Sequence, residues 1–373
     1  MKVCDVCDLV NGRAFKPSDW GSYGLPIVRI QNLNNEAAPF NYYSGEYNPA
    51  HEINNGELLF SWSGTPGTSF GAFRWYRGKG ILNQHIYKVV PKIDIDKDYL
   101  KYALNGNLSR IISKAHGGVG LQHITKKELN EITLRIVSND EQRKIVALLN
   151  QTQNVIFHRQ AQLAKLDELV KCRFVEMFNC KMQADCNKIL GDYAEVTGGF
   201  AFKSEKFEAE GVPIIRIGNI INNRVNLDEV VCYPEDFWEE NSAYRVNCGD
   251  ILMAMSGATT GKIGFCNSNS KLLLNQRVAR IRTKPLFNYT AFLRAALEQD
   301  WMAEHILKTA YGCAQPNISA AEIRQLPMPD TTIESVQCFT SFIHRIDKLR
   351  FDIQKSLNET QKLFDSLMQE YFD

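Results

Sequence analysis

The sequence lacks the features that mark exported and membrane proteins. It contains no apolar run of about eighteen residues, the length that a membrane-spanning helix needs. Its first eight residues carry charged side chains and no apolar core of the kind found in signal peptides. We therefore expect the ten cysteines to be reduced thiols in a cytoplasmic protein.

The sequence also lacks an excess of charge of either sign. It has 43 basic and 42 acidic residues among 373. Contacts to phosphate supply most non-specific affinity for DNA. A chain this neutral is expected to bind DNA weakly alone, or to need partners that add positive surface.

Motifs for catalysis and for metal binding are missing. Residues 257–262 (Gly-Ala-Thr-Thr-Gly-Lys) resemble a phosphate-binding loop, but one spacer residue is lacking and Ile263 stands where Ser or Thr is needed. Cys4 and Cys7 could begin a zinc site, but no second pair follows at a suitable spacing. The chain also lacks a dinucleotide-binding glycine motif and the Asn/Asp-Pro-Pro-Tyr/Phe segment of methyltransferases. The sequence predicts no catalytic residue, no metal and no cofactor in this chain.

What the chain does have is an internal repeat. Residues 12–33 and 199–220 are identical at ten of 22 positions, where chance would give roughly one or two. The similarity continues with small changes of offset in three further pairs of segments, 55–64 with 248–257, 82–84 with 274–276, and 124–129 with 318–323. The chain is therefore a duplication, either of a functional module or of a structural domain without a shared task.

Each copy has the pattern of an α+β domain. Short apolar runs bounded by Gly, Pro and Asn predict strands, and a helical stretch follows them in each copy. The predicted strands include residues 26–30, 56–60, 213–217 and 249–253, and the predicted helical stretches are 99–115 and 289–309.

A long helix is predicted after each copy. About 40 residues following Ser138 lack Gly and Pro, and their apolar positions alternate spacings of four and three, as in a coiled-coil seam. The segment after Asp330 behaves likewise. The seam positions assigned to partner-binding helices are Ile145, Leu149, Ile156, Leu163, Leu166, Ile343, Ile346, Ile353 and Leu357.

The order of these elements predicts the architecture. If the two ends of a domain emerge near each other, the second helix must run antiparallel to the first. We therefore expect an α+β fold in which two repeated strand-rich domains are separated by two long antiparallel coiled-coil helices, with pseudo-twofold symmetry. The expected boundaries are 1–138, 139–180, 181–330 and 331–373. A 40-residue helix is about 60 Å long, which corresponds to one to two turns of B-DNA. Periodicity alone leaves open whether the helices act as a ruler or serve only as a dimer stalk or as part of the core.

Several segments together resemble the specificity subunits of type I restriction-modification systems. They are 140–146 (Asp-Glu-Gln-Arg-Lys-Ile-Val), 211–219 (Gly-Val-Pro-Ile-Ile-Arg-Ile-Gly-Asn), 249–252 (Gly-Asp-Ile-Leu), 256–264 (Ser-Gly-Ala-Thr-Thr-Gly-Lys-Ile-Gly), 312–319 (Gly-Cys-Ala-Gln-Pro-Asn-Ile-Ser) and 326–329 (Leu-Pro-Met-Pro). The resemblance covers nearly the whole chain. The first copy departs from it by ending Leu-Arg-Ile-Val at 134–137 and by lacking Gly-Lys after residues 62–67.

The resemblance implies a non-catalytic, sequence-specific DNA-binding subunit. Each copy would be a target-recognition domain that reads one half of an asymmetric, bipartite site in double-stranded DNA, while the helices set the unread spacer. Two methyltransferase (modification) subunits, which bind S-adenosylmethionine, would dock on the chain, and each would flip and methylate an adenine. The resemblance also allows restriction/translocase subunits to join.

Candidate DNA-binding residues follow from matched loop positions, because polar and basic side chains on Gly-rich turns can reach phosphates and base edges. They are Arg13, Lys16, Ser63, Thr65, Arg74 and Arg77 in the first copy, and Lys203, Ser256, Thr259, Thr260, Lys262 and Gln315 in the second. Arg29 and Arg216 fall inside predicted strands and are expected to be structural. The alternative is a coiled-coil interaction scaffold that does not bind DNA. The strong difference between residues 62–77 and 255–270 favours two readers instead.

Overall fold

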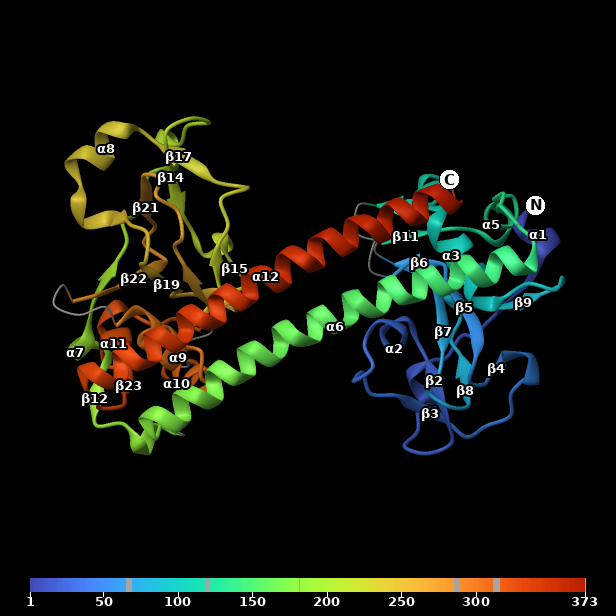
Figure 1. Ribbon diagram of the computed structural model, residues 1–373, viewed down its shortest axis with the longest axis horizontal. Coiled ribbons are helices and arrows are strands. Elements are labelled where there is room, and N and C mark those ends of the chain that lie inside the picture. The colour runs from blue at the N-terminus through green and yellow to red at the C-terminus, as the bar shows by residue number, and fades with distance from the viewer. Residues whose placement is uncertain (65–68, 119–120, 181, 285–288, 311–315, 373) are drawn as a thin grey trace. The chain divides into compact units, whose positions relative to one another are not determined.

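The computed structural model describes residues 1–64, 69–118, 121–180, 182–284, 289–310 and 316–372 (Figure 1). The chain divides into two compact units. Unit 1 consists of Met1–Gln160 and Lys355–Asp373, and unit 2 of Ala161–Gln354. Each unit thus holds one copy of the repeat and part of each long helix. Among the described residues, no helix combines the length and the hydropathy that crossing a membrane would require.

Unit 1 is built around two four-stranded sheets. The first is antiparallel in the order β1-β9-β5-β7, and the second has the order β3-β2-β8-β4, with β2 parallel to β8. A small sheet, β10-β11-β6, adjoins them. The strands are β1 (Cys7–Asn11), β2 (Leu25–Val28), β3 (Asn41–Tyr43), β4 (Glu52–Ile53), β5 (Glu57–Ser61), β6 (Ser63–Gly64), β7 (Gly71–Trp75), β8 (Gly80–Leu82), β9 (Ile86–Pro91), β10 (His116–Gly118) and β11 (Leu121–His123).

The helices of unit 1 cover these sheets. Helix α3 buries Leu100, Ala103 and Leu104 on one face and packs against β5 and β7, as Figure 1 shows. Asp96 begins this helix, since its carboxylate accepts hydrogen bonds from the N–H groups of Asp98 and Tyr99. The helical elements are α1 (Val3–Val6), η1 (Pro17–Asp19), α2 (Ile30–Asn34), η2 (Pro49–His51), α3 (Lys97–Gly106), α4 (Leu108–Ser113) and α5 (Lys126–Asn130).

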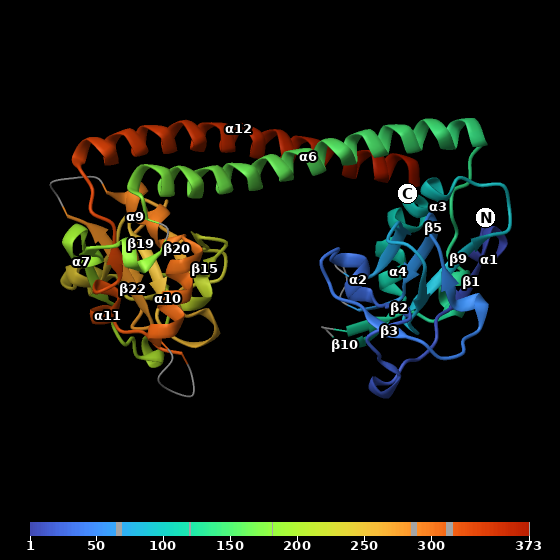
Figure 2. The ribbon, with the colours of Figure 1, turned by 90° about the horizontal axis from the view of Figure 1, so that it is seen from below.

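Unit 2 repeats this topology. Its larger sheet begins with β13-β22-β19-β20, an order that matches β1-β9-β5-β7 of unit 1, and then adds the hairpin β16-β15. Figure 2 labels four of its strands, β22, β19, β20 and β15. Its second sheet, β17-β14-β21-β18, again pairs two strands in parallel, here β14 and β21. The strands are β12 (Lys188–Ile189), β13 (Ala194–Gly198), β14 (Val212–Ile215), β15 (Ile220–Ile221), β16 (Arg224–Val225), β17 (Val231–Tyr233), β18 (Arg245–Val246), β19 (Ile251–Ala254), β20 (Ile263–Phe265), β21 (Leu272–Leu274), β22 (Val278–Thr283) and β23 (Pro327–Met328).

The helices of unit 2 also follow the repeat. The predicted stretch 289–309 forms two helices, just as 99–115 does in unit 1, and a buried amide lies at each break. Asn107 and Gln299 both donate to a carbonyl four residues back. The elements are η3 (Gln183–Asp185), α7 (Leu190–Tyr193), η4 (Ser204–Lys206), η5 (Ile217–Asn219), α8 (Glu235–Glu240), η6 (Ser242–Tyr244), η7 (Gly257–Thr259), α9 (Thr290–Leu297), α10 (Asp300–Ala310) and α11 (Ala320–Arg324).

The two long helices are α6 (Asn139–Phe178) and α12 (Ile333–Phe372), each of 40 residues. Within unit 2 they run antiparallel: the rings of Phe174 and Phe339 lie 5.9 Å apart, and the Arg350 guanidinium lies 2.6 Å from Asp167. Within unit 1 the start of α6 and the end of α12 share one hydrophobic core. The predicted α+β class, with two repeated domains and long antiparallel helices, is confirmed.

The structure corrects one detail of the strand prediction. Arg29 and Arg216 lie just beyond the ends of β2 and β14, not inside these strands. Their backbone N–H groups donate to the side-chain oxygens of Asn32 (3.0 Å) and Asn219 (2.9 Å), which begins a short helical turn in both copies. The repeated Arg-Ile-x-Asn segment is therefore a capped turn that ends the strand.

Candidate nucleic-acid interface

In unit 1 the repeated motifs meet at one place through backbone hydrogen bonds. The N–H of Arg13 donates to the Leu82 carbonyl at 2.9 Å, and the N–H of Trp62 donates to the His85 carbonyl at 3.2 Å. The N–H of Ile124 then donates to the Trp62 carbonyl at 3.1 Å. Segments far apart in the sequence are thereby fixed side by side.

The same network recurs in unit 2. Phe200 donates to Leu274 at 2.9 Å, Met255 to Arg277 at 2.8 Å, and Ile318 to Met255 at 2.9 Å. We call each of these places a motif junction. The junctions comprise residues 12–13, 62–63, 82–85 and 123–124 in unit 1, and 199–200, 255–256, 274–277 and 317–318 in unit 2.

A glycine is required where the first motif crosses the junction. A Cβ atom on Gly12 would lie 2.2 Å from the Asn83 carbonyl oxygen, and one on Gly199 would lie 2.1 Å from that of Asn275. Because backbone packs against backbone here, no larger residue fits without moving the chain. This explains why both copies carry glycine at the same point of the motif.

The junction of unit 1 is aromatic. The Trp62 ring stacks on Tyr87 with centroids 5.6 Å apart and meets the His85 ring edge-on at 5.1 Å. Its indole N–H donates to Asn11 Oδ1 at 3.2 Å. Burial, followed by the electrostatic interaction with the neighbouring His123, lowers the pKa of His85. This surface therefore carries rings and a neutral imidazole more readily than a fixed charge.

The junction of unit 2 is polar and cationic. Gln276 and Arg277 are exposed, and no described residue binds the Arg277 guanidinium. Beside them, the buried Ser256 hydroxyl has no hydrogen-bond partner among the described residues. The following loop is fixed, since the Thr260 hydroxyl lies 2.8 Å from the Gly257 carbonyl and 3.0 Å from that of Pro316. The Ser256 hydroxyl and the Arg277 guanidinium therefore adjoin a loop whose conformation is fixed by hydrogen bonds.

The predicted DNA-binding residues of unit 1 divide into exposed and internally bound side chains. Lys16 is exposed. The Arg13 guanidinium donates to the Tyr43 hydroxyl at 2.8 Å and to the Glu46 carbonyl at 3.0 Å. Arg74 forms an ion pair with Asp98 at 3.2 Å, and Arg77 donates to the Asn32 carbonyl at 3.0 Å while lying over the Phe40 ring at 4.3 Å. Ser63 is buried. Arg13 and Arg77 thus bind neighbouring segments, Arg74 links strand β7 to helix α3, and Thr65 lies outside the described residues.

In unit 2 the cationic candidates are freer. Lys203 and Lys262 are exposed, and their side chains have no partner in the described part of the chain. The Thr259 hydroxyl donates to the Ser256 carbonyl at 3.3 Å, so Ser256, Thr259 and Thr260 belong to one loop, as expected. Gln315 lies outside the described residues.

The sequence-based selection left out Gln84, His85, Gln276 and Arg277, which the junctions bring beside the selected loops. A usable signal existed, because Leu-Asn-Gln at 82–84 recurs at 274–276. The repeat marks Gln84 and Gln276 as equivalent positions. Only the backbone pairing shows that they and the residues after them adjoin Trp62 and Met255.

The helix positions assigned to partner binding are largely used within the chain. Ile145 and Leu149 are buried in the core of unit 1, and Ile343 and Ile346 in that of unit 2. The remaining five, Ile156, Leu163, Leu166, Ile353 and Leu357, are half-buried. Other apolar side chains of the long helices are exposed instead, most of all Phe157 (64%) and Phe351 (68%).

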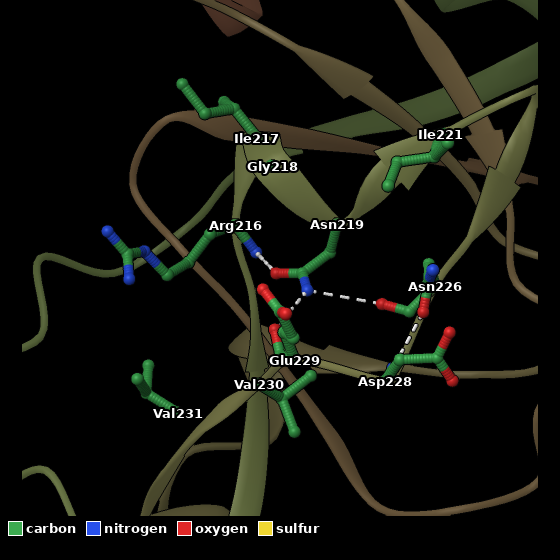
Figure 3. A pocket seen from close by; sticks show the side chains of 10 residues that line it. All are labelled: Arg216, Ile217, Gly218, Asn219, Ile221, Asn226, Asp228, Glu229, Val230 and Val231. Atoms are coloured by element: carbon green, nitrogen blue, oxygen red, sulfur yellow. Dashed lines mark hydrogen bonds between the residues drawn. The ribbon is translucent and has the colours of Figure 1, made fainter. Parts of the chain in front are cut away.

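A cavity of about 800 Å³ in unit 2 adjoins the capped turn (Figure 3). Asn219 holds its wall: its amide donates to the Asn226 carbonyl at 3.2 Å and to the Glu229 carbonyl at 2.9 Å. The carboxylates of Asp228 and Glu229 line the cavity. Arg216 also lines the cavity, so its wall combines two carboxylates with one guanidinium. No described group of three or more His, Cys, Asp or Glu residues offers a metal site.

Comparison with known proteins identifies the family. The family of type I restriction modification DNA specificity domains matches residues 1–167 and 187–361, and the chain belongs to this family. As a type I restriction-modification specificity subunit, it has DNA sequence recognition as its implied role, and subunits of this family are generally non-catalytic.

Named relatives and solved structures agree with this assignment. The chain is 24% identical to the specificity subunit of the type I restriction enzyme MjaVIII of Methanocaldococcus jannaschii, over 85% of this chain and 78% of the relative. It is 21% identical to the EcoBI specificity subunit of Escherichia coli, over 98% and 82%. The fold is similar to the type I S subunit from M. genitalium, with a TM-score of 0.56, 16% identity and coverage of 100% and 95%.

Proposed function

We propose that the chain reads a bipartite, asymmetric DNA site, one half with each repeated domain, and directs partner adenine methyltransferase subunits to it. The observation that carries this proposal is the pair of motif junctions, in which one backbone network presents different side chains. Reading two unlike half-sites requires unlike readers on like frames. A scaffold without a ligand would give no reason for this combination.

The contacts to DNA divide by chemistry. Lys16, Lys203 and Lys262, which are exposed, would contact phosphates and so position the duplex. Arg277 and Gln276 would contact base edges, because a guanidinium or an amide can bind a base in bidentate fashion. Ser63, Thr65, Ser256, Thr259, Thr260 and Gln315 stay in the proposal as candidate contacts. Arg13 and Arg77 chiefly hold neighbouring segments of unit 1, and Arg74 is engaged by Asp98 from within strand β7.

The partners supply catalysis and charge. Two methyltransferase subunits that bind S-adenosylmethionine would dock on the long helices, and restriction/translocase subunits could join them in the cytoplasm. The exposed Phe157 and Phe351 are apolar side chains of the long helices that such subunits would cover. In this arrangement residues 1–138 and 181–330 are the readers, residues 139–180 and 331–373 set the spacer, and the chain itself is non-catalytic.

The test is a domain exchange in the reconstituted complex. The full chain, mixed with its cognate methyltransferase subunits, should protect two separated stretches of one duplex. Replacing residues 181–330 with the corresponding domain of another specificity subunit should change one half-site only. A change in both halves would contradict independent readers, and a lack of protection in the unaltered complex would favour the scaffold.

The spacer role is tested separately. Removing two turns (seven residues) from the middle of α6 and a matching seven from α12 should shorten the preferred spacer while leaving both half-sites unchanged. A complex that kept its original spacer would show that the helices do not measure distance.

A further inference from the structure

Two cysteines face each other where α6 leads into the second domain. The helix ends at Phe178, and Asn179, with φ of 47°, turns the chain away from the helix axis. Cys180 Sγ then lies 3.1 Å from Cys186 Sγ. It is the one thiol–thiol contact found among the described residues.

The two thiols differ in access to solvent. Cys180 is fully buried and belongs to the main hydrophobic core of unit 2, whereas Cys186 is half-buried at the edge of that core. A small oxidant can therefore reach Cys186 but not Cys180. Thiols that react with peroxides characteristically combine this exposure with a second thiol in contact.

We propose that Cys180 and Cys186 form a reversible redox pair, in which hydroperoxides oxidise Cys186 and Cys180 resolves the product as an intramolecular disulfide. The sulfurs need to approach by only about 1 Å to reach bonding distance. Neither the DNA-reading role nor the family assignment involves this pair.

The chemistry balances in two steps. The Cys186 thiolate attacks the terminal peroxide oxygen and the O–O bond breaks, forming Cys186 sulfenic acid and releasing hydroxide or an alkoxide, which takes up a proton to give water or an alcohol. The Cys180 sulfur then attacks the sulfenic sulfur, forming the S–S bond and releasing water as the thiol proton joins the departing hydroxyl. The two cysteines are oxidised by two electrons in total, and the hydroperoxide is reduced.

Electrostatics assigns the same roles to the two sulfurs. The hydrogen bond from the Cys180 thiol lowers the pKa of Cys186, and the same contact together with burial raises the pKa of Cys180. The other buried thiols are unlike Cys186: burial raises the pKa of Cys7 to about 12 and also raises the pKa values of Cys232 and Cys266. Cys186 is thus the reactive sulfur and Cys180 the resolving one.

The experiment uses the full chain treated with a few equivalents of hydrogen peroxide, blocked with N-ethylmaleimide, and digested without reduction for mass spectrometry. We expect peptides joined through Cys180 and Cys186, two hydrogens lighter than the thiol form, and restored by dithiothreitol. In Cys180→Ser, dimedone should trap the Cys186 sulfenic acid. In Cys186→Ser, Cys180 should stay a thiol.

The exposed Cys172 provides the matched control, because it lies on α6 without a described thiol partner. Cys172→Ser should leave the Cys180–Cys186 product unchanged. The proposal is overturned if Cys180 and Cys186 both remain open to alkylation after denaturation while other cysteines oxidise. It is equally overturned if Cys186 ends as sulfinic acid or pairs with a different cysteine.

Discussion

The two motif junctions are alike in backbone and unlike in side chain. Both are held by the same three backbone hydrogen bonds and the same glycine contact. Unit 1 then presents Trp62 and His85, whereas unit 2 presents Met255 and Arg277 at the matching positions. The comparison teaches that the frame depends on glycine and on backbone pairing, which leaves the neighbouring side chains free to differ.

The two units also use their cationic side chains differently. In unit 1, Arg13, Arg74 and Arg77 are engaged by the unit's own carbonyls, hydroxyls and carboxylates. In unit 2, Lys203, Lys262 and Arg277 have no such partners in the described ranges. Among these six residues, those of unit 2 are therefore the freer to contact phosphate and base, while in unit 1 the exposed Lys16 has that role.

The largest expected effect tests the shared frame. Gly199→Ala should destabilise unit 2 by more than about 3 kcal/mol, because the new Cβ would meet a backbone carbonyl that cannot move alone. Gly12→Ala should do the same to unit 1. Hydrogen exchange followed by mass spectrometry would show the loss of protection in each unit separately.

Gly218→Ala is the matched control for that pair. A Cβ there would meet nothing within 4 Å, so unfolding of unit 2 should be unchanged within about 0.5 kcal/mol. If Gly199→Ala proved as mild as Gly218→Ala, the junction would not be the rigid frame that we describe.

The next effect concerns reading. Arg277→Ala should weaken specific DNA binding of the reconstituted complex by about 1–3 kcal/mol and relax one base position in one half-site, since an arginine bidentate to guanine contributes that much discrimination. His85→Ala should affect the other half-site. Selection from randomised half-sites would measure both. An equal loss on all sequences would assign Arg277 to phosphate instead.

Much of the fold could be predicted because duplication repeats every signal. Three signals occur twice: the glycine motif, the Leu-Asn-Gln segment at 82–84 and 274–276, and a long stretch with coiled-coil spacing of apolar residues. They gave the two domains and the long helices, whose observed bounds are Asn139–Phe178 and Ile333–Phe372. The extra hairpin β15–β16 was not predicted, because its strands of two residues each are too short to show alternation.

The candidate site was harder to predict, because sequence cannot show whether an arginine is free. In the sequence, Arg77 and Lys262 are both basic residues beside glycines and look equally suited to DNA, although Arg77 follows β7 and Lys262 precedes the matching strand β20. Only the structure shows that Arg77 is held by Phe40 and the Asn32 carbonyl while Lys262 is exposed. The burial of the helix seam could not be read from spacing either, since a seam looks the same whether it packs on its own domain or on a partner.

A smaller effect separates structural from electrostatic roles. Arg77→Ala should destabilise unit 1 by about 1–2 kcal/mol through the lost ring contact and hydrogen bond, with the salt dependence of DNA binding unchanged. Lys262→Ala should leave stability unchanged and reduce the slope of log K against log salt by roughly one. Denaturation and a salt titration would measure the two quantities. A reversed result would exchange the roles of the two residues.

The smallest effect concerns pH and again distinguishes the two units. Because burial lowers the pKa of His85 in the folded state, the unfolded chain takes up a proton at this site more readily than the folded one does. Stability of unit 1 should therefore fall as pH decreases below the ordinary histidine value of about 6.5, and His85→Gln should remove part of that fall. Unit 2 has Arg277 at the matching position and should show no such contribution.

Hydrogen exchange in each unit at pH 7.5 and 6.0 would reveal the difference, with the exposed His158→Gln as the control. If His158→Gln removed as much of the pH dependence as His85→Gln, burial at the junction would not be its cause.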